Sequence, residues 1–174
     1  IDLMTNPDAF KFSSRKITLS TVSLLPELEQ LAKEKISFRL AISLNASDDE
    51  TRSYLMPINR RYSLKKVLEA CRNFPLRPRT RITFEYVLVE GVNDSSQDAK
   101  RLVKILRGIP SKVNLIPLNE APGITFKRPS EEKIKRFQEI LMEGGLTSMI
   151  RASKGAEISA ACGQLQGKSS VLSY

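Results

Sequence analysis

The chain has 174 residues, and its 28 lysines and arginines exceed its 19 acidic residues to give a formal net charge of +9. This length suits one domain with a hydrophobic core, and no apolar run approaches the roughly 20 residues that cross a bilayer. The chain has no histidine, which excludes the usual general base, Ser-His-Asp triads and zinc sites with histidine ligands.

The charge and the two cysteines predict a compartment and a kind of partner. Two cysteines, with a polar N-terminus that does not resemble a signal peptide, predict a cytoplasmic protein. The positive charge predicts a polyanionic partner, with nucleic acid favoured over an anionic membrane surface.

Short apolar runs alternate with amphipathic stretches along the chain. We expect residues 1–14 to form an irregular leading segment, residues 15–167 the main domain and residues 168–174 a polar tail. Strands are predicted at residues 16–19, 38–44, 81–89, 112–117 and 147–152. Helices are predicted to start near Pro26 and at Ser47, Ser63, residues 93–95 and Ser130.

The periodicity also predicts the fold class. Leu64, Val67, Leu68 and Cys71 recur at helical spacing on one face, so Cys71 is predicted to be a core residue. Five strands that recur about every 30 residues, with helices between them, are typical of βα units and a parallel sheet. The sequence has no dinucleotide fingerprint and no phosphate loop, which disfavours an open nucleotide-binding sheet.

Polar residues follow the predicted strands. They are Ser20 and Thr21, Ser43 and Asn45, Glu85 or Glu90, Asn119, and Arg151 and Ser153. In a parallel barrel these strand ends line one mouth, where ligands bind. Turn formation alone explains Ser47 and Asn93 better than it explains Asn45 and Asn119. We therefore predict a partial parallel barrel with a polar mouth.

A segment rich in small residues surrounds the second cysteine. In residues 155–167, GAEISAACGQLQG, Cys162 follows two alanines and precedes Gly163, which admits backbone angles that larger residues resist. Small neighbours let a bulky ligand approach the sulfur. The alternative is that Cys162 is a small buried hydrophobe. With only Cys71 besides it, this thiol belongs neither to a disulfide framework nor to a four-cysteine metal site.

Several motifs occur in order over nearly all of residues 15–167. They are TLST, SLNASDDETRSYLMPINRRY, FEYVLVEGVNDS, KVNLIPLNEAPG, RPSEEKIKRFQEIL and IRASKGAEISAACGQL, of which AACGQL is the most specific. Together they resemble the radical S-adenosylmethionine RNA methyltransferases of the RlmN and Cfr group. That family methylates an adenosine of 23S rRNA. RlmN types act on carbon 2, and on certain transfer RNAs as well, whereas Cfr types act on carbon 8; AACGQL with KVNLIPLN favours the RlmN side.

The resemblance implies a fold, cofactors and site residues. The fold is a partial (β/α) TIM-like barrel of the radical SAM type, here without its N-terminal units. The cofactors are S-adenosylmethionine and a [4Fe–4S] cluster held by a CxxxCxxC motif. The residues implied to contact S-adenosylmethionine are Ser20, Ser43, the backbone of Leu44, Asn45 and Asn119.

The same resemblance implies that Cys162 becomes S-methylated during the reaction. A thiolate is nucleophilic enough to take a methyl group from a sulfonium. The thioether then loses a hydrogen atom to a deoxyadenosyl radical, and its carbon adds to the adenine. A second cysteine resolves the adduct through a transient disulfide bond.

The sequence departs from the family's pattern in three respects. Asn45 stands where the family usually has histidine, and residues 155–159, GAEIS, replace a more acidic stretch. The CxxxCxxC motif, the resolving cysteine and a catalytic glutamate lie upstream in the family and are not in this chain. Two cysteines cannot hold a [4Fe–4S] cluster in the usual way. We therefore expect the C-terminal barrel part of the enzyme, inactive by itself.

Basic residues are candidates to meet RNA phosphates, and a flavodoxin-type electron donor is the other expected partner. The candidates are Arg77, Arg79, Lys127, Arg128, Arg151 and Lys154, although single exposed charges are more typical of a solvated face. Two other classes stay open. One is a basic RNA-binding or assembly module without chemistry, in which Cys162 is inert. The other is a radical enzyme with the same cofactor and a different substrate.

Overall fold

A five-stranded parallel sheet forms the centre of the molecule. The computed structural model describes residues 2–22, 25–34, 38–120, 123 and 125–151. The strands are β1 (Thr18–Thr21), β2 (Arg39–Ser43), β3 (Ile82–Leu88), β4 (Ser111–Pro117) and β5 (Thr147–Ile150). Every neighbouring pair is parallel, and the order in the sheet, β1-β2-β3-β4-β5, is the order along the chain. The predicted parallel α/β sheet is confirmed.

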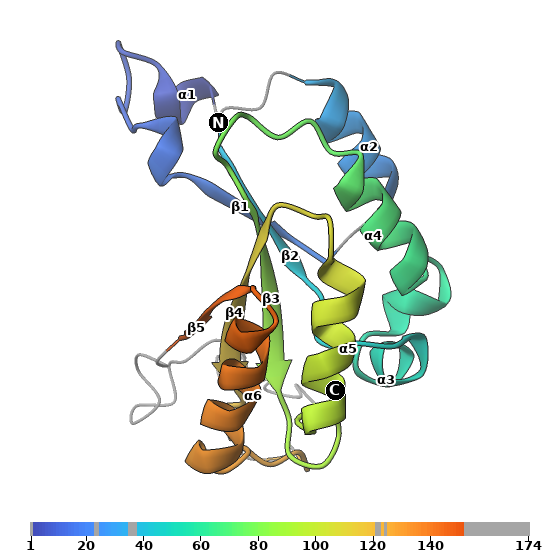
Figure 1. The fold of residues 1–174 in the computed structure, drawn as a ribbon. Helices are drawn as coiled ribbons and strands as arrows, with labels where there is room; N and C mark the ends of the chain where they lie inside the picture. The colour runs from blue at the N-terminus through green and yellow to red at the C-terminus, as the bar shows by residue number, and fades with distance from the viewer. Residues whose placement is uncertain (1, 23–24, 35–37, 121–122, 124, 152–174) are drawn as a thin grey trace, which may run out of the picture.

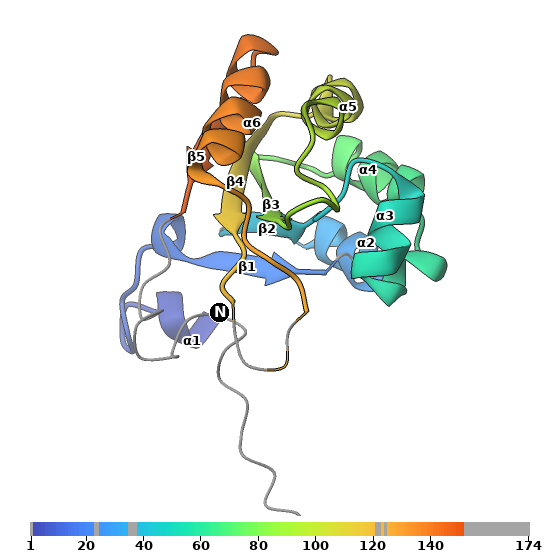
Figure 2. The same cartoon turned by 90° about the horizontal axis from the view of Figure 1, so that it is seen from below.

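Helices cover one face of this sheet (Figures 1 and 2). They are α2 (Leu25–Lys33), α3 (Asp49–Leu55), α4 (Leu64–Arg72), α5 (Ser96–Leu106) and α6 (Glu131–Glu143). Because the strand order never reverses, successive right-handed crossovers place their helices on the same side. No helix in the described part of the chain is long and apolar enough to cross a bilayer.

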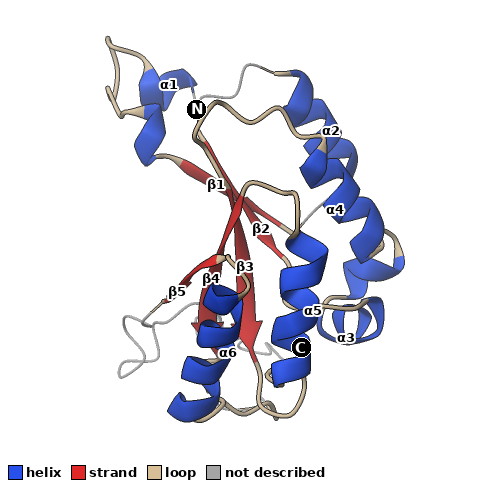
Figure 3. Ribbon diagram, in the orientation of Figure 1, coloured by secondary structure: helices blue, strands red, loops and turns tan. Residues whose placement is uncertain are grey.

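The opposite face of the sheet has no such layer in the described residues, as the single layer of helices in Figure 3 shows. Only the short α1 (Asp2–Thr5) lies on the far side of β1 from the other helices (Figure 2). Two 3-10 turns, η1 (Ser14–Lys16) and η2 (Pro57–Arg60), complete the elements. One covered and one open face make a segment of a barrel, as predicted, and not a doubly wound sheet.

The hydrophobic core lies between the sheet and its helices. Alternate residues of β3 point into it, so Ile82, Phe84, Tyr86 and Leu88 are fully buried. The predicted apolar face of α4 is confirmed, with Leu64, Val67, Leu68 and Cys71 all buried. The Tyr86 ring packs on Phe137 of α6 with 5.3 Å between ring centroids. Each large side chain buried in this way contributes about 1.5–3 kcal/mol.

Several predicted element starts are shifted in the structure. The first strand begins at Thr18 and not at residue 16, because residues 14–16 form η1. The prediction that Ser47 caps α3 is wrong, since Asp48 is the N-cap and its Oδ1 accepts from the Thr51 amide at 2.8 Å. Ser47 is buried, and its hydroxyl donates to Asp98 Oδ1 at 3.1 Å.

Two further helix starts also differ in detail. α4 begins after Ser63 as predicted, but the Ser63 side chain caps no amide; the Leu64 amide donates to Asp49 Oδ1 at 2.7 Å. α5 begins at Ser96 behind its N-cap Ser95, so Asn93 lies in the preceding loop and not in the helix.

Because Cys71 is buried, we expect its contribution to the free energy of unfolding to decrease at alkaline pH. Desolvation raises the pKa of this thiol from 9.0 to about 12. Between these values the unfolded chain binds fewer protons than the folded one, so the thiol's contribution is complete below pH 9 and is lost as pH rises toward 12. We expect wild type to exceed Cys71→Ala in unfolding free energy by about 1 kcal/mol near neutral pH, and the difference to shrink above pH 9. Urea unfolding across this range measures it, and a constant difference would contradict the prediction.

Candidate functional site

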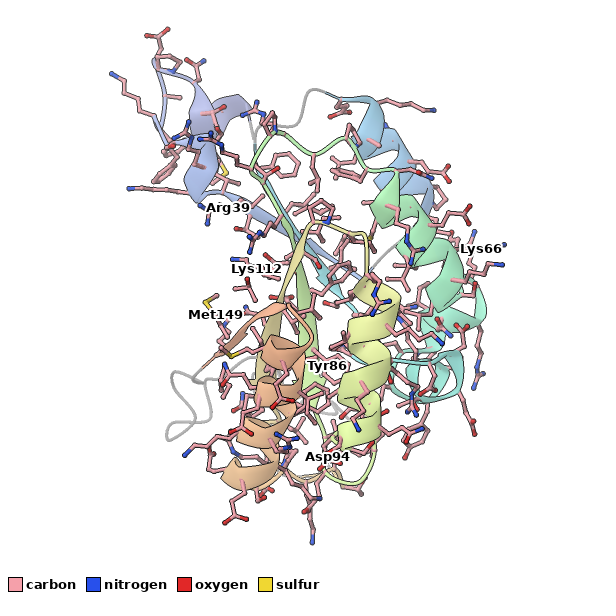
Figure 4. All side chains as sticks on the ribbon, viewed as in Figure 1. Arg39, Lys66, Tyr86, Asp94, Lys112 and Met149 are labelled. Carbon is pink, nitrogen blue, oxygen red and sulfur yellow. The ribbon has the colours of Figure 1, made fainter. Side chains whose placement is uncertain are left out.

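Polar side chains occupy the helix-free face of the sheet. The register places Ser43 of β2 beside Glu85 of β3, and Glu85 beside Asn114 of β4. These residues alternate with the buried ones along each strand, and therefore point away from the helices. In Figure 4, Lys112 and Met149 lie on this same side of the sheet, whereas Tyr86 lies between the sheet and its helices.

Glu85 lies at the centre of this face. Its Oε2 accepts a hydrogen bond from the Ser20 hydroxyl at 2.9 Å, and its Oε1 lies 3.9 Å from Arg151 Nη1. The Glu85 side chain is only 20% exposed. One carboxylate therefore connects β1, β3 and the end of β5, and its remaining lone pairs can accept from an ammonium or hydroxyl group of a ligand.

The loop after β2 is fastened to β3. The Leu44 amide donates to the Glu85 carbonyl at 2.9 Å. Asn45 has a left-handed backbone with φ of 58°, which asparagine tolerates better than most residues. Its side chain accepts from the Val87 amide at 2.9 Å and donates to the Met56 sulfur at 3.3 Å. Both ends of the Asn45 amide are therefore engaged within the protein.

The side-chain amide of Asn93 also joins the loop after β2 to the end of β3. Asn93 is fully buried, and its Nδ2 donates to the carbonyls of Asn45 at 2.8 Å and Val87 at 2.7 Å. Its Oδ1 accepts from the Val89 amide at 2.8 Å, and its own carbonyl accepts from the Tyr86 hydroxyl at 2.9 Å. The role of Asn93 is structural, as the sequence suggested.

The buried side chain of Arg52 forms hydrogen bonds with the loop after β2. Arg52 is completely buried, and its Nε donates to the Leu44 carbonyl at 3.1 Å. Its Nη1 donates to Asn59 Oδ1 at 2.7 Å and to the Tyr62 carbonyl at 3.3 Å, whereas Nη2 has no partner among the described residues. Burial lowers the pKa of this guanidinium. The Leu44 backbone is thus fixed by both its amide and its carbonyl.

The structure brings two of the predicted cofactor contacts, Ser20 and Ser43, next to Glu85. Asn119 follows β4 at the carboxyl end of the sheet; Ser20 is exposed, and Ser43 and Asn119 are half-buried. Cys162 and Lys154 lie outside the described residues. Sequence reasoning about strand ends left Glu85 and Glu90 as two options. The alternation of polar and apolar residues in ITFEYVL is a signal that would have favoured Glu85.

The predicted RNA-contacting residues fall into two groups. Lys127, Arg128 and Arg151 lie toward the carboxyl end of the sheet, where the Lys127 carbonyl accepts from the Glu90 amide at 2.9 Å. Arg128 Nη2 pairs there with Glu131 at 2.7 Å. Arg77 and Arg79 precede β3 and so lie at the opposite, amino end. These residues do not form one surface.

The cysteines of this chain do not fit an iron–sulfur cluster. Cys71 is free and buried, and only Cys162 remains. Among the described residues no group of three or more His, Cys, Asp or Glu side chains is placed to hold a metal ion. No disulfide bond occurs in that part of the structure either.

Comparison with known proteins identifies the class. The family model of the radical SAM superfamily matches residues 4–103, and the chain belongs to this superfamily, whose members use S-adenosylmethionine and a [4Fe–4S] cluster. The crystal structure of a radical SAM methyltransferase from Sphaerobacter thermophilus superposes with a TM-score of 0.88 at 46% identity, covering 92% of this chain and 47% of that one. A domain of pyruvate-formate lyase-activating enzyme from Bacteroides vulgatus shares the fold, with a TM-score of 0.60 at 19% identity over 78% of this chain and 80% of that one.

Curated relatives narrow the comparison within that class. The dual-specificity RNA methyltransferase RlmN of Syntrophotalea carbinolica is 51% identical over 98% of this chain and 46% of its own length. That of Geotalea uraniireducens is 52% identical over 97% of this chain and 49% of its own length. The resemblance seen in the sequence motifs is confirmed, and the chain spans about half the length of the curated relatives it matches.

We expect the buried side-chain amide of Asn93, which joins the loop after β2 to the end of β3, to contribute strongly to the stability of the fold. Asn93→Ala removes three hydrogen bonds and leaves the Val89 amide and two carbonyls unpaired, which costs about 2–4 kcal/mol of unfolding free energy. Gln97→Ala, on the exposed side of α5, is the matched control and stays within about 0.5 kcal/mol. Urea unfolding of both variants tests this, and equal midpoints for Asn93→Ala and wild type would contradict it.

Proposed function

We propose that this chain is the barrel part of an RlmN-type RNA methyltransferase that acts on carbon 2 of an adenosine in 23S rRNA and in transfer RNA. The observation that carries the proposal is the identity of 51–52% to RlmN proteins over nearly the whole chain, together with Cys162 in AACGQL. The net charge of +9 suits an RNA substrate. A cytoplasmic setting and a flavodoxin-type electron donor belong to the same proposal.

The helix-free face suits S-adenosylmethionine chemically. The hydroxyls of Ser20 and Ser43, the amide of Asn119 and the carboxylate of Glu85 offer donors and acceptors for ribose hydroxyls and for a zwitterionic methionine end. Ser20 already donates to Glu85 at 2.9 Å, so the hydroxyl orients the carboxylate. We assign these four residues as ligand contacts.

Leu44 and Asn45 have a different role in this proposal. Their amide and carbonyl groups are engaged with Glu85, Val87 and Arg52 inside the protein. These hydrogen bonds therefore fix the position of the loop that directly follows Ser43, the last residue of β2. We assign Asn45 as a positioning residue, which explains why an asparagine serves where the family usually has histidine.

Cys162 is proposed to carry the methyl group. S-adenosylmethionine supplies a methyl group on a sulfonium sulfur. The Cys162 thiolate attacks this carbon, a new sulfur–carbon bond forms, and the electron pair of the breaking sulfonium bond stays on the departing thioether. Alanines on one side of Cys162 and a glycine on the other leave room for this approach.

The later, radical part of the reaction requires groups that this chain does not contain. Its two cysteines do not supply a cluster site, so we expect no methylation of RNA by this chain alone. Carbon 8 as the target, as in Cfr types, and a binding module without chemistry remain the alternatives that the following experiments distinguish.

Peptide mass mapping of the cluster-loaded protein that contains this chain tests the role of Cys162. After incubation with S-adenosylmethionine, we expect a gain of about 14 Da on the Cys162 peptide and none on the Cys71 peptide, because only the first thiol is proposed as nucleophile. Cys71→Ala keeps the gain and Cys162→Ala loses it. An unmodified Cys162 would contradict the carrier role and favour the binding module. Analysis of the methylated RNA then separates carbon 2 from carbon 8.

Substitution of a proposed ligand contact is expected to weaken cofactor binding without unfolding the chain. Ser43→Ala removes one hydrogen bond, worth about 0.5–1.5 kcal/mol, so the dissociation constant of S-adenosylmethionine rises about 2- to 13-fold. Equilibrium dialysis with labelled S-adenosylmethionine measures the change. Ser96→Ala, at the exposed start of α5, is the control. Equal affinities of the two variants would remove Ser43 from the site.

A further inference from the structure

A pocket lined by arginines opens at the amino end of the sheet, opposite to the end that carries Asn93 and the loop after β2. Its volume is about 430 Å³. It lies between the start of β2 and the loop of residues 74–81, which is the green connection near the top of Figure 1. The arginines that line it are Arg15, Arg39, Arg77, Arg79 and Arg81. Neither aspartate nor glutamate is among the described residues that line it.

The loop that supplies three of these arginines is held in place. Phe74 anchors it in the core with 7% exposure. A turn follows, in which the amide and the hydroxyl of Thr80 donate to the Arg77 carbonyl at 3.1 Å and 2.6 Å. Arg79 within this turn has φ of 63°. The backbone of this loop is therefore organised before any ligand binds, which lowers the backbone entropy lost on binding.

Carboxylates of the described residues do not neutralise the charges of this pocket. Among the described residues, none of the five arginines forms an ion pair with a carboxylate. Arg81 donates only to the Thr147 hydroxyl, at 2.8 Å. All five are exposed, so their guanidinium groups can rearrange around a ligand. Arginine is the residue best suited to bidentate contacts with phosphate oxygens.

We propose that this arginine pocket binds the phosphodiester backbone of RNA, at a place separate from the reaction site. The inference rests on the proposed function, because it takes the RNA substrate as the ligand. Arg39 of the pocket and Ser43 of the proposed cofactor site lie at the two ends of β2, which places them about 13 Å apart at 3.3 Å per residue. An RNA stem-loop is long enough to contact the arginine pocket while its target adenosine lies at the opposite end of the sheet.

Removal of two arginines tests the pocket. The double variant Arg77→Gln with Arg79→Gln is compared with Lys100→Gln plus Lys104→Gln, which removes the same charge from exposed positions of α5. Fluorescence anisotropy of a labelled 23S rRNA hairpin, titrated at several salt concentrations, gives the affinity and its salt dependence. We expect the arginine variant to bind about tenfold more weakly and to lose about 1.4–2 from the slope of log K against log salt. The lysine variant should stay within about twofold of wild type.

The possible outcomes separate this inference from the proposed function. Equal affinities of the two variants would contradict RNA binding by the arginine pocket. The proposed function would be unaffected, provided that wild type binds the hairpin and Cys162 gains its methyl group. A wild-type protein that binds no RNA at low salt would overturn both. Inorganic phosphate alone is titrated as well. If wild type binds phosphate tightly and the arginine variant does not, while both bind RNA equally well, the ligand of the pocket is a free anion. That result would contradict the RNA assignment.

Discussion

Hydrogen bonds of the buried Asn93 side chain hold together the ends of β2 and β3, which carry the candidate site. Asn93 joins the carbonyl of Asn45, after β2, to the carbonyl of Val87 and the amide of Val89, at the end of β3. Regular pairing of β2 with β3 ends at Ser43 and Glu85. Just beyond that point the Leu44 amide still donates to the Glu85 carbonyl. Further along, side chains join the two segments, and the Asn45 side chain accepts from the Val87 amide. These hydrogen bonds help to fix the register of Ser43 against Glu85.

The loop after β2 also explains why Arg52 is buried without an ion pair to any described residue. Arg52 donates to the Leu44 and Tyr62 carbonyls and to the Asn59 amide oxygen. A fully buried cation is costly unless its donors are satisfied, and here most of them are used to fix a loop of irregular backbone. Its planar fork reaches three acceptors from separate segments, which a lysine ammonium would not do with the same geometry.

The sequence predicted the elements well because their physical signals are local. Apolar periodicity located the face of α4, including Cys71, and serines marked the starts of α5 and α6. The local signals failed at Ser47, which resembled a cap although its hydroxyl donates to Asp98, 51 positions away. They also gave no sign that the Asn45 side chain accepts from an amide 42 positions away, and the contact of Asn45 with S-adenosylmethionine stays a prediction.

Residues of the candidate site show the same limit in another form. Glu85 lies inside β3 and not at its end, so a search for polar residues after strands ranks it beside Glu90 without separating them. Only the register with Ser43 and Asn114 places it at the centre of the helix-free face. Arg52 offers no local signal, because an arginine in a short amphipathic helix is normally solvated. Its burial depends on the loop that folds over it.

The distribution of charge, more than its total, separates the two ends of the sheet. At the carboxyl end, several described cations are paired with carboxylates, as in Lys133 with Asp94 at 3.2 Å and Arg101 with Asp48 at 3.2 Å. These two pairs join helices to loops. At the amino end the arginine pocket has no acidic residue among the lining residues that the structure describes. Unpaired like charges repel one another at close range, a cost that folding alone does not repay. A polyanionic ligand removes that repulsion, and this physical asymmetry is the reason to look for RNA contacts away from the reaction site.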